Sequence, residues 1–138
     1  MTFLLDTSVL IRGALEPHTV PTAEQKILSD SNATFGLSAY SLWEVGKKVQ
    51  KGKLILPGDL LAWFGEVLTN VNVLPLTPSI IADAMRLPDF PNHDPGDELI
   101  VATARVHKLT LLTTDTQLKN YRHARIHYFK PILNTGRK

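Results

Sequence analysis

The apolar residues of this chain fall into short continuous runs that alternate with segments of helical periodicity. The continuous β-favouring runs predict strands at residues 2–6, 34–38, 71–77, 109–115 and 125–129. The helical segments, several bounded by Ser, Pro or Gly, predict helices at residues 7–15, 22–31, 39–52, 60–68, 78–87, 97–108 and 116–121. Alternating strands and helices are typical of a parallel sheet covered on both faces. The sequence therefore predicts a single three-layer α/β domain, with a mainly parallel central sheet flanked by helices.

Composition limits the class of protein. The 138 residues are enough for one domain with its own core, and we expect a single domain over 1–138, with about 131–138 as a basic tail. The absence of cysteine excludes disulfides, thiolate chemistry and cysteine zinc sites. No apolar run approaches the roughly 20 residues that span a bilayer, and no secretory signal pattern opens the chain. We expect a cytoplasmic protein that makes no membrane contact.

Charge is distributed unevenly along the chain. The formal net charge of +2 predicts no partner by itself. After Asp115, however, the chain has no further acid and six basic residues, namely Lys119, Arg122, Arg125, Lys130, Arg137 and Lys138. A basic end of this kind can hold a polyanion such as nucleic acid, or it can be plain solvated surface. The residues that would bind a substrate are not assigned by the sequence.

Several acids stand at the ends of predicted elements. Asp6 ends the first strand and Asp115 ends the strand at 109–115, while Asp97, just after Asp94, opens the helix at 97–108. In open parallel sheets, ligands bind beyond the carboxyl ends of the strands, where Asp6 and Asp115 are expected to meet. Glu44 lies in the helix that follows the second strand.

Each of these acids also has a purely structural interpretation. Asp6 and Asp115 can cap the helices that follow them, and Asp94 and Asp97 can favour a helix N-terminus through its dipole. Glu44 completes a capping box with Ser41, or it is a solvated residue opposite an apolar stripe.

Taken together, the acids indicate chemistry more strongly. Two carboxylates about 5 Å apart repel by roughly 3 kcal/mol at an effective dielectric constant near 20, so a cluster either holds protons or binds a hard cation. Ligand sets made only of oxygen suit Mg²⁺ or Mn²⁺ rather than zinc.

Four segments carry a resemblance to a known family. "FLLDTSVLI", "LSAYSLWEVGKKVQKGKL", "HDPGDELIVATAR" and "LTLLTTD" resemble the acidic motifs of PIN-domain ribonucleases, and most of all the VapC-type toxins of type II toxin–antitoxin pairs. The motifs occur in family order and span nearly the whole chain, so the resemblance implies a PIN-like fold.

The resemblance also implies roles for particular residues. The catalytic acids would be Asp6, Glu44, Asp97 and Asp115. Three of them, Asp6, Asp97 and Asp115, would hold the metal with Asp94 as an auxiliary, and Ser8, Thr113 and Thr114 would support the site. The chain departs from the family at Glu98, because relatives often have a basic residue after the third acid. This departure would make the site more negative, and the sequence does not tell how it alters substrate affinity or preference.

The implied activity is hydrolysis of RNA phosphodiesters that depends on Mg²⁺ or Mn²⁺ and leaves a 5′-phosphate and a 3′-hydroxyl. The implied partners are a small cognate antitoxin protein and a second copy of the chain. The apolar helix at 60–68 can serve either interface, although Trp63 and Phe64 can equally belong to the core, and Trp43 is similarly ambiguous.

Three alternatives remain at this point. The chain could be a PIN-like RNA-binding module without catalysis. It could be a metal-free nuclease with a histidine acid–base pair, for which His93 is the most interesting candidate because it adjoins an acidic motif. A phosphotransfer domain would need a second acid two residues after Asp6, or an acid pair with a lysine on a late strand, and "DTSV" supplies neither pattern.

Overall fold

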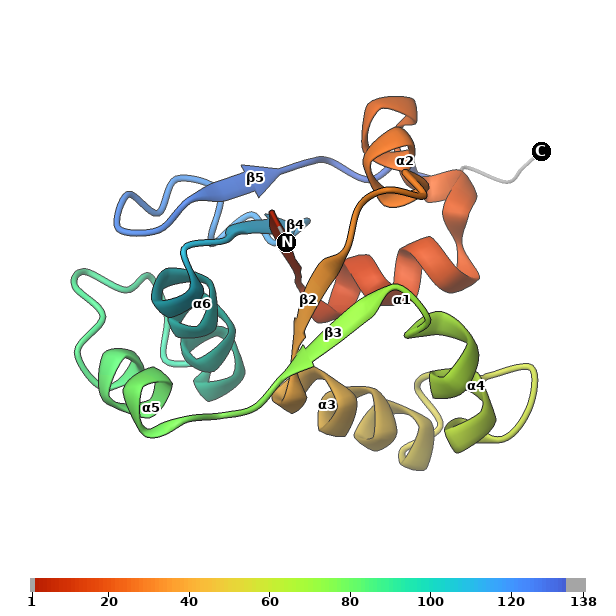
Figure 1. Cartoon of the computed structure of the whole chain (residues 1–138), viewed down its shortest axis with the longest axis horizontal. Helices are drawn as coiled ribbons and strands as arrows, with labels where there is room; N and C mark the ends of the chain where they lie inside the picture. Colours follow the sequence, from red (N-terminus) through yellow and green to blue (C-terminus); the bar gives the residue numbers. More distant parts are fainter. Residues whose placement is uncertain (1, 134–138) are drawn as a thin grey trace.

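A computed structural model of the chain describes residues 2–133. Its strands are β1 (Phe3–Leu5), β2 (Phe35–Ser38), β3 (Val71–Leu74), β4 (Thr110–Thr113) and β5 (Ile126–Tyr128). Its helices are α1 (Thr7–Leu15), α2 (Thr22–Leu28), α3 (Ala39–Gln50), α4 (Leu60–Val67), α5 (Pro78–Ala84) and α6 (Pro95–His107), with a 3₁₀ turn η1 (Pro17–Thr19) (Figure 1). The end of the predicted basic tail, including Arg137 and Lys138, lies outside the described residues.

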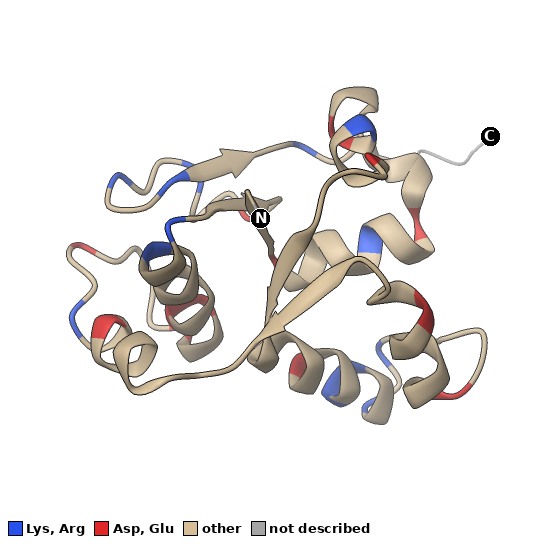
Figure 2. Cartoon of the chain, in the orientation of Figure 1, with Lys and Arg blue, Asp and Glu red and all other residues tan. Residues whose placement is uncertain are grey.

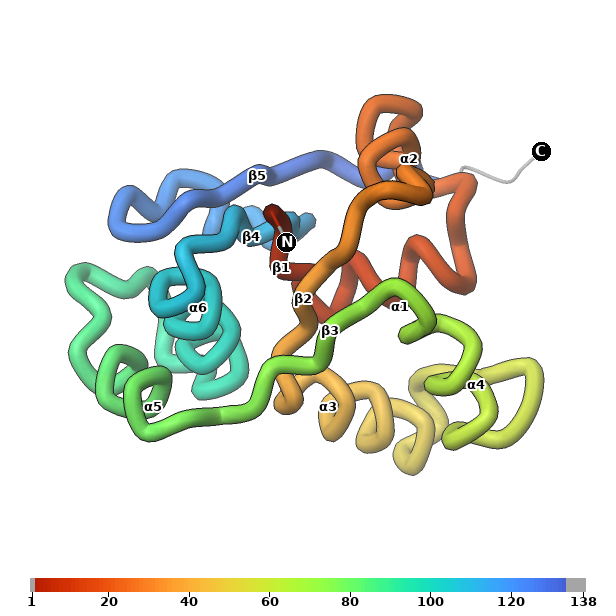
Figure 3. Tube along the Cα trace, in the orientation of Figure 1, coloured from red at the N-terminus to blue at the C-terminus, as the bar shows by residue number. Residues whose placement is uncertain are grey.

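The five strands form one sheet in the order β3-β2-β1-β4-β5, and every neighbouring pair is parallel. β1 lies in the centre, where Leu4 is in register with Gly36 of β2 and with Leu111 of β4. From β1 the chain first builds outward through β2 and β3, and later adds β4 and β5 on the other side (Figure 3). The strand order therefore reverses between β1 and β4, which is where open parallel sheets bind ligands.

Alternate residues of the central strands enter two separate cores. Leu4 and Leu111 pack with Ile100 and Val101 of α6, on one face of the sheet. Their neighbours Leu5 and Leu112 belong to the core on the other face, together with α1 residues Val9 and Leu10. Successive side chains of a strand point to opposite faces, so both faces must be covered. The predicted three-layer α/β fold is confirmed, and α5 packs on α6 through Ile80, Ala84 and Ala102.

One predicted helix is absent from the described residues. Residues 116–121 form consecutive turns instead, closed by hydrogen bonds from Leu118 N–H to the Asp115 carbonyl and from Tyr121 N–H to the Leu118 carbonyl. A helix of six residues is marginal by itself, and here tertiary contacts decide the conformation. Leu118 is fully buried, and the Tyr121 hydroxyl donates a 2.8 Å hydrogen bond to the Pro88 carbonyl.

The remaining boundaries differ by a few residues. α2 ends at Leu28 rather than residue 31, where the Asp30 carboxylate accepts a hydrogen bond from the Asn32 N–H. α6 begins two residues before the predicted start, since Pro95 occupies its first position, where proline is well tolerated. Among residues 2–133, no helix combines the length and the apolar character needed to cross a membrane.

Candidate active site

Asp6 occupies the junction between the central strand β1 and helix α1. Its Oδ1 accepts a 2.8 Å hydrogen bond from the Thr7 N–H, so the capping role considered for Asp6 is real. Its Oδ2 accepts a 2.6 Å hydrogen bond from the Thr113 hydroxyl. A carboxylate offers about four acceptor positions, so these two bonds leave part of its capacity free. Asp6 can therefore cap α1 and serve a site at the same time.

A cleft of about 670 Å³ opens at the carboxyl ends of β1 and β4. All four acids predicted from the sequence line it, namely Asp6, Glu44, Asp97 and Asp115. The predicted supporting residues Ser8 and Thr114 line it as well, and their hydroxyl oxygens lie 3.0 Å apart. The acids come from positions up to 109 residues apart in the chain, and the sheet topology is what brings them together.

Glu44 reaches the cleft from the second turn of α3. The predicted capping box of Ser41 and Glu44 is wrong, because α3 begins earlier and its cap is Ser38, whose Oγ accepts a 3.1 Å hydrogen bond from the Tyr40 N–H. Ser41 is fully buried and accepts a 2.8 Å hydrogen bond from the Thr7 hydroxyl instead. Glu44 is thus half-buried in the cleft rather than solvated.

Asp97 stands at the third position of α6. The helix cap is Asp94, whose Oδ1 accepts hydrogen bonds from the N–H groups of Gly96 and Asp97, so the structural role considered for Asp94 is confirmed. Asp94 is absent from the cleft lining among residues 2–133, and it acts on the site through the backbone of Asp97. Asp97 Oδ2 accepts a 3.0 Å hydrogen bond from the side chain of Asn92, a residue that the sequence did not single out.

Gly96 explains how α6 approaches α3 closely enough to join the site. A Cβ atom at this position would lie 2.5 Å from the Tyr40 ring. Only glycine permits this contact without a shift of the ring, and the contact brings the start of α6 beside the segment of α3 that carries Glu44.

Asp115 follows β4 and is held by its neighbours. Its N–H donates a 3.0 Å hydrogen bond to the Thr113 hydroxyl oxygen, and its Oδ1 accepts one of 2.9 Å from the Gln117 N–H. Asp115 therefore stabilises a turn, since the predicted helix after it does not form. Thr113 contacts both ends of the site, because it also donates to Asp6.

The electrostatics of the site are unfavourable to full ionisation. Burial raises the pKa of Asp6 to about 6, against the hydrogen bonds from Thr113 and Thr7, and the charges of Glu44 and Asp115 add to the rise. Burial and then the Asp94 carboxylate raise the pKa of Asp97 to about 7, with smaller contributions from Asp6 and Asp115. Both shifts have the causes expected for desolvated carboxylates with like charges nearby.

The donor chemistry fits a hard divalent cation. In the conformation described for residues 2–133, no three Asp, Glu, His or Cys side chains converge on a single ion-sized position. Mg²⁺ does not require such a cage, because it usually retains several waters and binds one or two carboxylates. The cleft offers oxygen ligands only and has raised carboxyl pKa values, so a cation there would relieve the repulsion between the acids.

Comparison with known proteins identifies the family. Residues 3–124 match the PIN domain. The chain belongs to the PIN-domain family. It is 31% identical over 124 residues to Ribonuclease VapC22 of Mycobacterium tuberculosis (strain ATCC 25618 / H37Rv), covering 90% of this chain and 95% of that relative. The family predicted from the four acidic motifs is thereby confirmed.

Solved structures share the PIN fold. VapBC from Salmonella typhimurium, determined bound to DNA, has a chain that superposes with a TM-score of 0.73 at 18% identity, covering 93% of this chain and 98% of that one. VapBC2 from Rickettsia felis, bound to a DNA fragment from its promoter, gives a TM-score of 0.72 at 16% identity, with the same coverage of 93% and 98%.

The cleft of this PIN domain also has basic lining residues that sequence reasoning missed. They are Arg12 of α1, Lys48 of α3 and Lys53. Lys48 lies four residues after Glu44, on the same side of α3, and Figure 2 shows acidic and then basic positions along this helix. The spacing between Glu44 and Lys48 was the only available signal, because a sequence does not tell which surface cations face a cleft.

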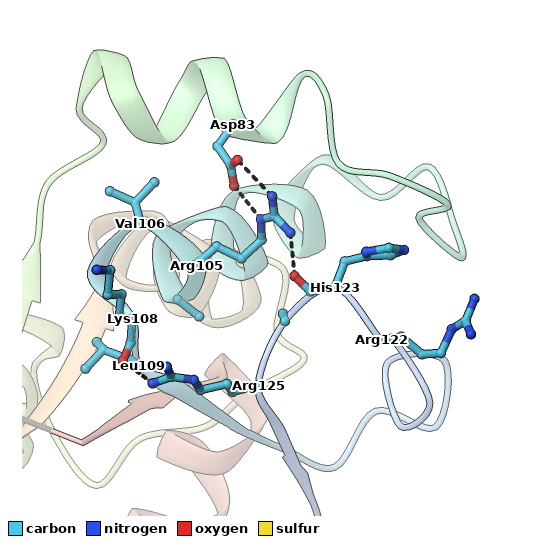
Figure 4. Close-up of a pocket in the computed structure, with 10 residues that line it drawn as sticks. Asp83, Arg105, Val106, Lys108, Leu109, Arg122, His123 and Arg125 are labelled. Carbon is cyan, nitrogen blue, oxygen red and sulfur yellow. Dashed lines mark hydrogen bonds and ion pairs between the residues drawn. The ribbon is translucent and has the colours of Figure 1, made fainter.

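The basic residues near the C-terminus lie elsewhere. Arg122 and Arg125 line a separate pocket at the opposite end of β4 from the acids. There Arg105 binds Asp83 and the His123 carbonyl, and Arg125 donates a 3.1 Å hydrogen bond to the Lys108 carbonyl (Figure 4). These contacts tie α5, α6 and the segment before β5 together, and nucleic-acid binding by this basic end remains a prediction.

The histidines do not support metal-free chemistry. Among residues 2–133, no histidine lines the acidic cleft. His127 lies 3.1 Å from Glu24 and packs edge-on against Phe3, and His123 lies 3.4 Å from Asp89. His93 is exposed in the loop before α6. The acids are therefore the better candidates for the chemistry of this PIN domain.

Proposed function

We propose that this PIN domain is a metal-dependent endoribonuclease and the toxin of a toxin–antitoxin pair. The observation that carries the proposal is the single cleft lined by Asp6, Glu44, Asp97 and Asp115, in a chain related to a ribonuclease of the VapC type. The raised pKa values of Asp6 and Asp97 support it, since buried carboxylates that lie close together are stabilised by a bound cation.

The metal would be Mg²⁺ or Mn²⁺, held by Asp6, Asp97 and Asp115 either directly or through its retained waters. When bound, a divalent cation lowers the pKa of water and offsets the charge that develops on the phosphate. Within residues 2–133 the Glu44 carboxylate takes part in no helix cap, so it is free to accept the proton of the attacking water. As the water oxygen attaches to phosphorus, the bond to the 3′-oxygen breaks. The products are a 5′-phosphate and a 3′-hydroxyl, and solvent supplies the hydroxyl proton.

The acids alone would repel the RNA phosphates, and the basic residues that line the same cleft offset this repulsion. Arg12, Lys48 and Lys53 share the cleft with the four acids, so backbone phosphates on either side of the scissile bond can meet a positive charge. Binding through such contacts releases counterions and weakens as salt rises. We therefore propose that these three residues bind the phosphates of the RNA backbone.

We infer a small antitoxin as the partner, and a homodimer as the second assembly. Support for the antitoxin comes from structural neighbours that are themselves toxin–antitoxin assemblies, including a toxin-antitoxin complex from Klebsiella pneumoniae. Of the α4 residues considered for an interface, Trp63 belongs to the core, at 5% exposed, whereas Leu61 is 78% exposed. A cytoplasmic location, where RNA and antitoxin are both present, is part of the same proposal.

The experiment compares the purified chain with its Asp6→Asn variant on labelled single-stranded RNA. We expect cleavage with Mg²⁺ or Mn²⁺, its loss in EDTA, its return when the metal is added back, and products with 5′-phosphates. Asn retains the size of Asp6 and part of its capping ability, so the variant should fold with unchanged circular dichroism.

Two outcomes would contradict the proposal. RNA that binds but is never cleaved under any metal condition would favour the alternative of a non-catalytic binding module. Cleavage that persists in EDTA, or that a folded Asp6→Asn variant carries out at the parent rate, would show that the acidic cleft is not the reaction site.

A further inference from the structure

An exposed aromatic residue stands beside the acidic cleft. Trp43 of α3 is 57% exposed, although it directly precedes the cleft residue Glu44. Its ring packs against the Tyr40 ring in a tilted arrangement, with centroids 5.7 Å apart and an angle of 35° between the planes. The Lys47 ammonium lies 5.6 Å from the centre of the Trp43 ring. The three side chains thus combine two adjoining aromatic rings with a positive charge on one surface.

The geometry of α3 connects this surface to the cleft. With about 100° of rotation per residue, Tyr40 lies roughly 40° around the helix axis from Glu44, Lys47 about 60° and Trp43 about 100°. All three lie on the side of Glu44 away from the buried Val45, whereas the cleft residue Lys48 lies on the other side of Glu44. The aromatic surface is therefore the outward continuation of the wall that carries Glu44.

Tyr40 fixes this surface relative to the acids. Its ring rests against Gly96 at the start of α6, next to Asp97. Burial and the charges of Glu44, Asp94 and Asp97 raise the pKa of its hydroxyl, as expected for a phenol that lies near these carboxylates. Trp43 therefore packs against the Tyr40 ring, whose position is fixed because it extends from α3 and lies against Gly96 of α6.

We propose that Trp43, supported by Tyr40, stacks on a base of single-stranded RNA next to the phosphate that is cleaved, and that Lys47 contacts the adjoining backbone. The inference rests on the proposed ribonuclease function and adds a substrate-positioning residue to it. Single-stranded RNA is commonly recognised by stacking of unpaired bases on exposed aromatic rings, often beside a positive charge. A paired base is already stacked inside its duplex, so this surface selects single strands.

The test separates stacking on a base from contacts with the ribose-phosphate backbone. Two probes of equal length and charge are compared, a 12-nucleotide oligoadenylate and the corresponding abasic ribose-phosphate oligomer, in the Asp6→Asn background so that neither is cut. Trp43→Ala should weaken binding of oligoadenylate by roughly 5- to 160-fold, the usual range for loss of one base–aromatic stack, and leave binding of the abasic oligomer unchanged. Trp43→Phe should restore most of the affinity, since a smaller ring remains.

Fluorescence supplies a second readout. The chain has two tryptophans, and Trp63 is buried in the core, so quenching on addition of oligoadenylate should come from Trp43 and vanish in Trp43→Phe. Met85→Ala is the matched control, because Met85 is an exposed apolar residue at the end of α5 and should alter neither affinity nor quenching.

The outcomes separate the stack from the proposed activity. Equal affinities of the parent and Trp43→Ala for both probes would overturn the stacking, even if the parent protein cleaves RNA. Loss of self-association in Trp43→Ala with unchanged RNA affinity would assign Trp43 to a protein interface and also overturn it. A parent that binds oligoadenylate through Trp43 yet never cleaves RNA would leave the stack standing and remove the catalytic function. A parent that binds neither probe would overturn both.

Discussion

The Thr113 hydroxyl lies 2.6 Å from Oδ2 of Asp6 and donates a hydrogen bond to it. The same hydroxyl oxygen accepts a hydrogen bond from the Asp115 N–H, so one fully buried side chain joins two of the four acids. Thr113 is shielded from solvent, and its hydroxyl both orients Asp6 and holds the backbone of Asp115. It is therefore a positioning residue whose effect can be measured through Asp6.

Replacing Thr113 by valine should change the pH dependence of cleavage. Valine keeps the shape but removes the donor, and a hydrogen bond to the ionised carboxylate lowers the pKa of Asp6. Without it the pKa should rise above about 6, and the acidic limb of the pH–rate profile should move to higher pH. The variant should also lose about 1–3 kcal/mol of stability because a buried acceptor loses its partner.

Thr113→Ser restores the donor and serves as the control. A pH–rate profile that is the same in Thr113→Val, Thr113→Ser and the parent would mean that Asp6 does not titrate in the reaction.

The raised pKa values also predict how stability responds to pH. Asp6 and Asp97 bind protons more tightly in the folded than in the unfolded chain, with folded pKa values of about 6 and about 7 against 3.8. Between pH 4 and 7 the folded state therefore holds more protons, and these two groups make the free energy of unfolding fall as pH rises through this window. In metal-free buffer, the loss of Tm between pH 5 and pH 8 should be smaller in Asp97→Asn than in the parent.

Glu66→Gln is the matched control, because Glu66 is an exposed acid away from the acidic cleft. Parallel Tm curves for the parent and Asp97→Asn would show that Asp97 carries its charge without cost in the folded chain.

Divalent metal should offset the fall of Tm that is expected between pH 5 and pH 8. A cation at free concentration c that binds only the folded chain adds RT ln(1 + c/Kd) to the free energy of unfolding and so raises Tm as its concentration rises, and protons compete with it for the same carboxylates. Millimolar Mg²⁺ or Mn²⁺ should therefore raise Tm at pH 8 more than at pH 5, and the rise should shrink in Asp115→Asn but persist in Glu66→Gln. An unchanged Tm throughout the metal titration would count against the carboxylates as ligands.

Lys53 and Lys51 offer a matched pair for testing the substrate backbone. Lys53 lines the acidic cleft, whereas Lys51, two residues earlier, is an exposed residue at the end of α3 that does not. In the Asp6→Asn background, Lys53→Ala should weaken RNA binding and reduce the slope of log affinity against log salt by about 0.7, the value for one phosphate contact on a single strand. Equal slopes for Lys53→Ala and for the control Lys51→Ala would show that Lys53 does not contact the RNA backbone.

At Glu98, where relatives often have a basic residue, a substitution should strengthen RNA binding instead of weakening it. Glu98 is half-buried and turned about 100° around α6 from Asp97, outside the cleft lining among the described residues. In the Asp6→Asn background, Glu98→Arg should tighten RNA binding and steepen its salt dependence, because a positive charge at the start of α6 would face the approaching phosphate. Glu98→Gln separates the removal of a negative charge from the gain of a positive one. Affinities and slopes that match those of the parent would leave Glu98 as a helix residue only.

The sequence predicted those features that local patterns determine. β1 and α1 were predicted within a residue because a continuous apolar run, an acidic cap and a helical spacing succeed one another without interruption. The acids at the ends of β1 and β4 followed from the same logic, since parallel strands present their carboxyl ends at one edge. The turns at 116–121 were missed because burial of Leu118 outweighs the helical preference of its neighbours.

The parts of the site that were missed depend on contacts between distant segments. Asn92 hydrogen-bonds both to Asp97 and to Gln117, which the chain places after β4, and nothing near Asn92 in the sequence indicates either partner. Arg12 reaches the cleft from the second turn of α1, and only the packing of α1 against α3 decides where that turn lies. Local patterns do not contain such information.

The pairing of β1 with β4 has a consequence for the chain as it is made. Leu5 is in register with Leu112, so the central strand β1 pairs with a neighbour that is translated 107 residues later. A nascent or truncated chain that stops before Thr110 has Asp6 but neither Thr113 to orient it nor Asp115 beside it. The acidic cleft is therefore completed only after β4 and Asp115 have been translated and β4 has paired with β1.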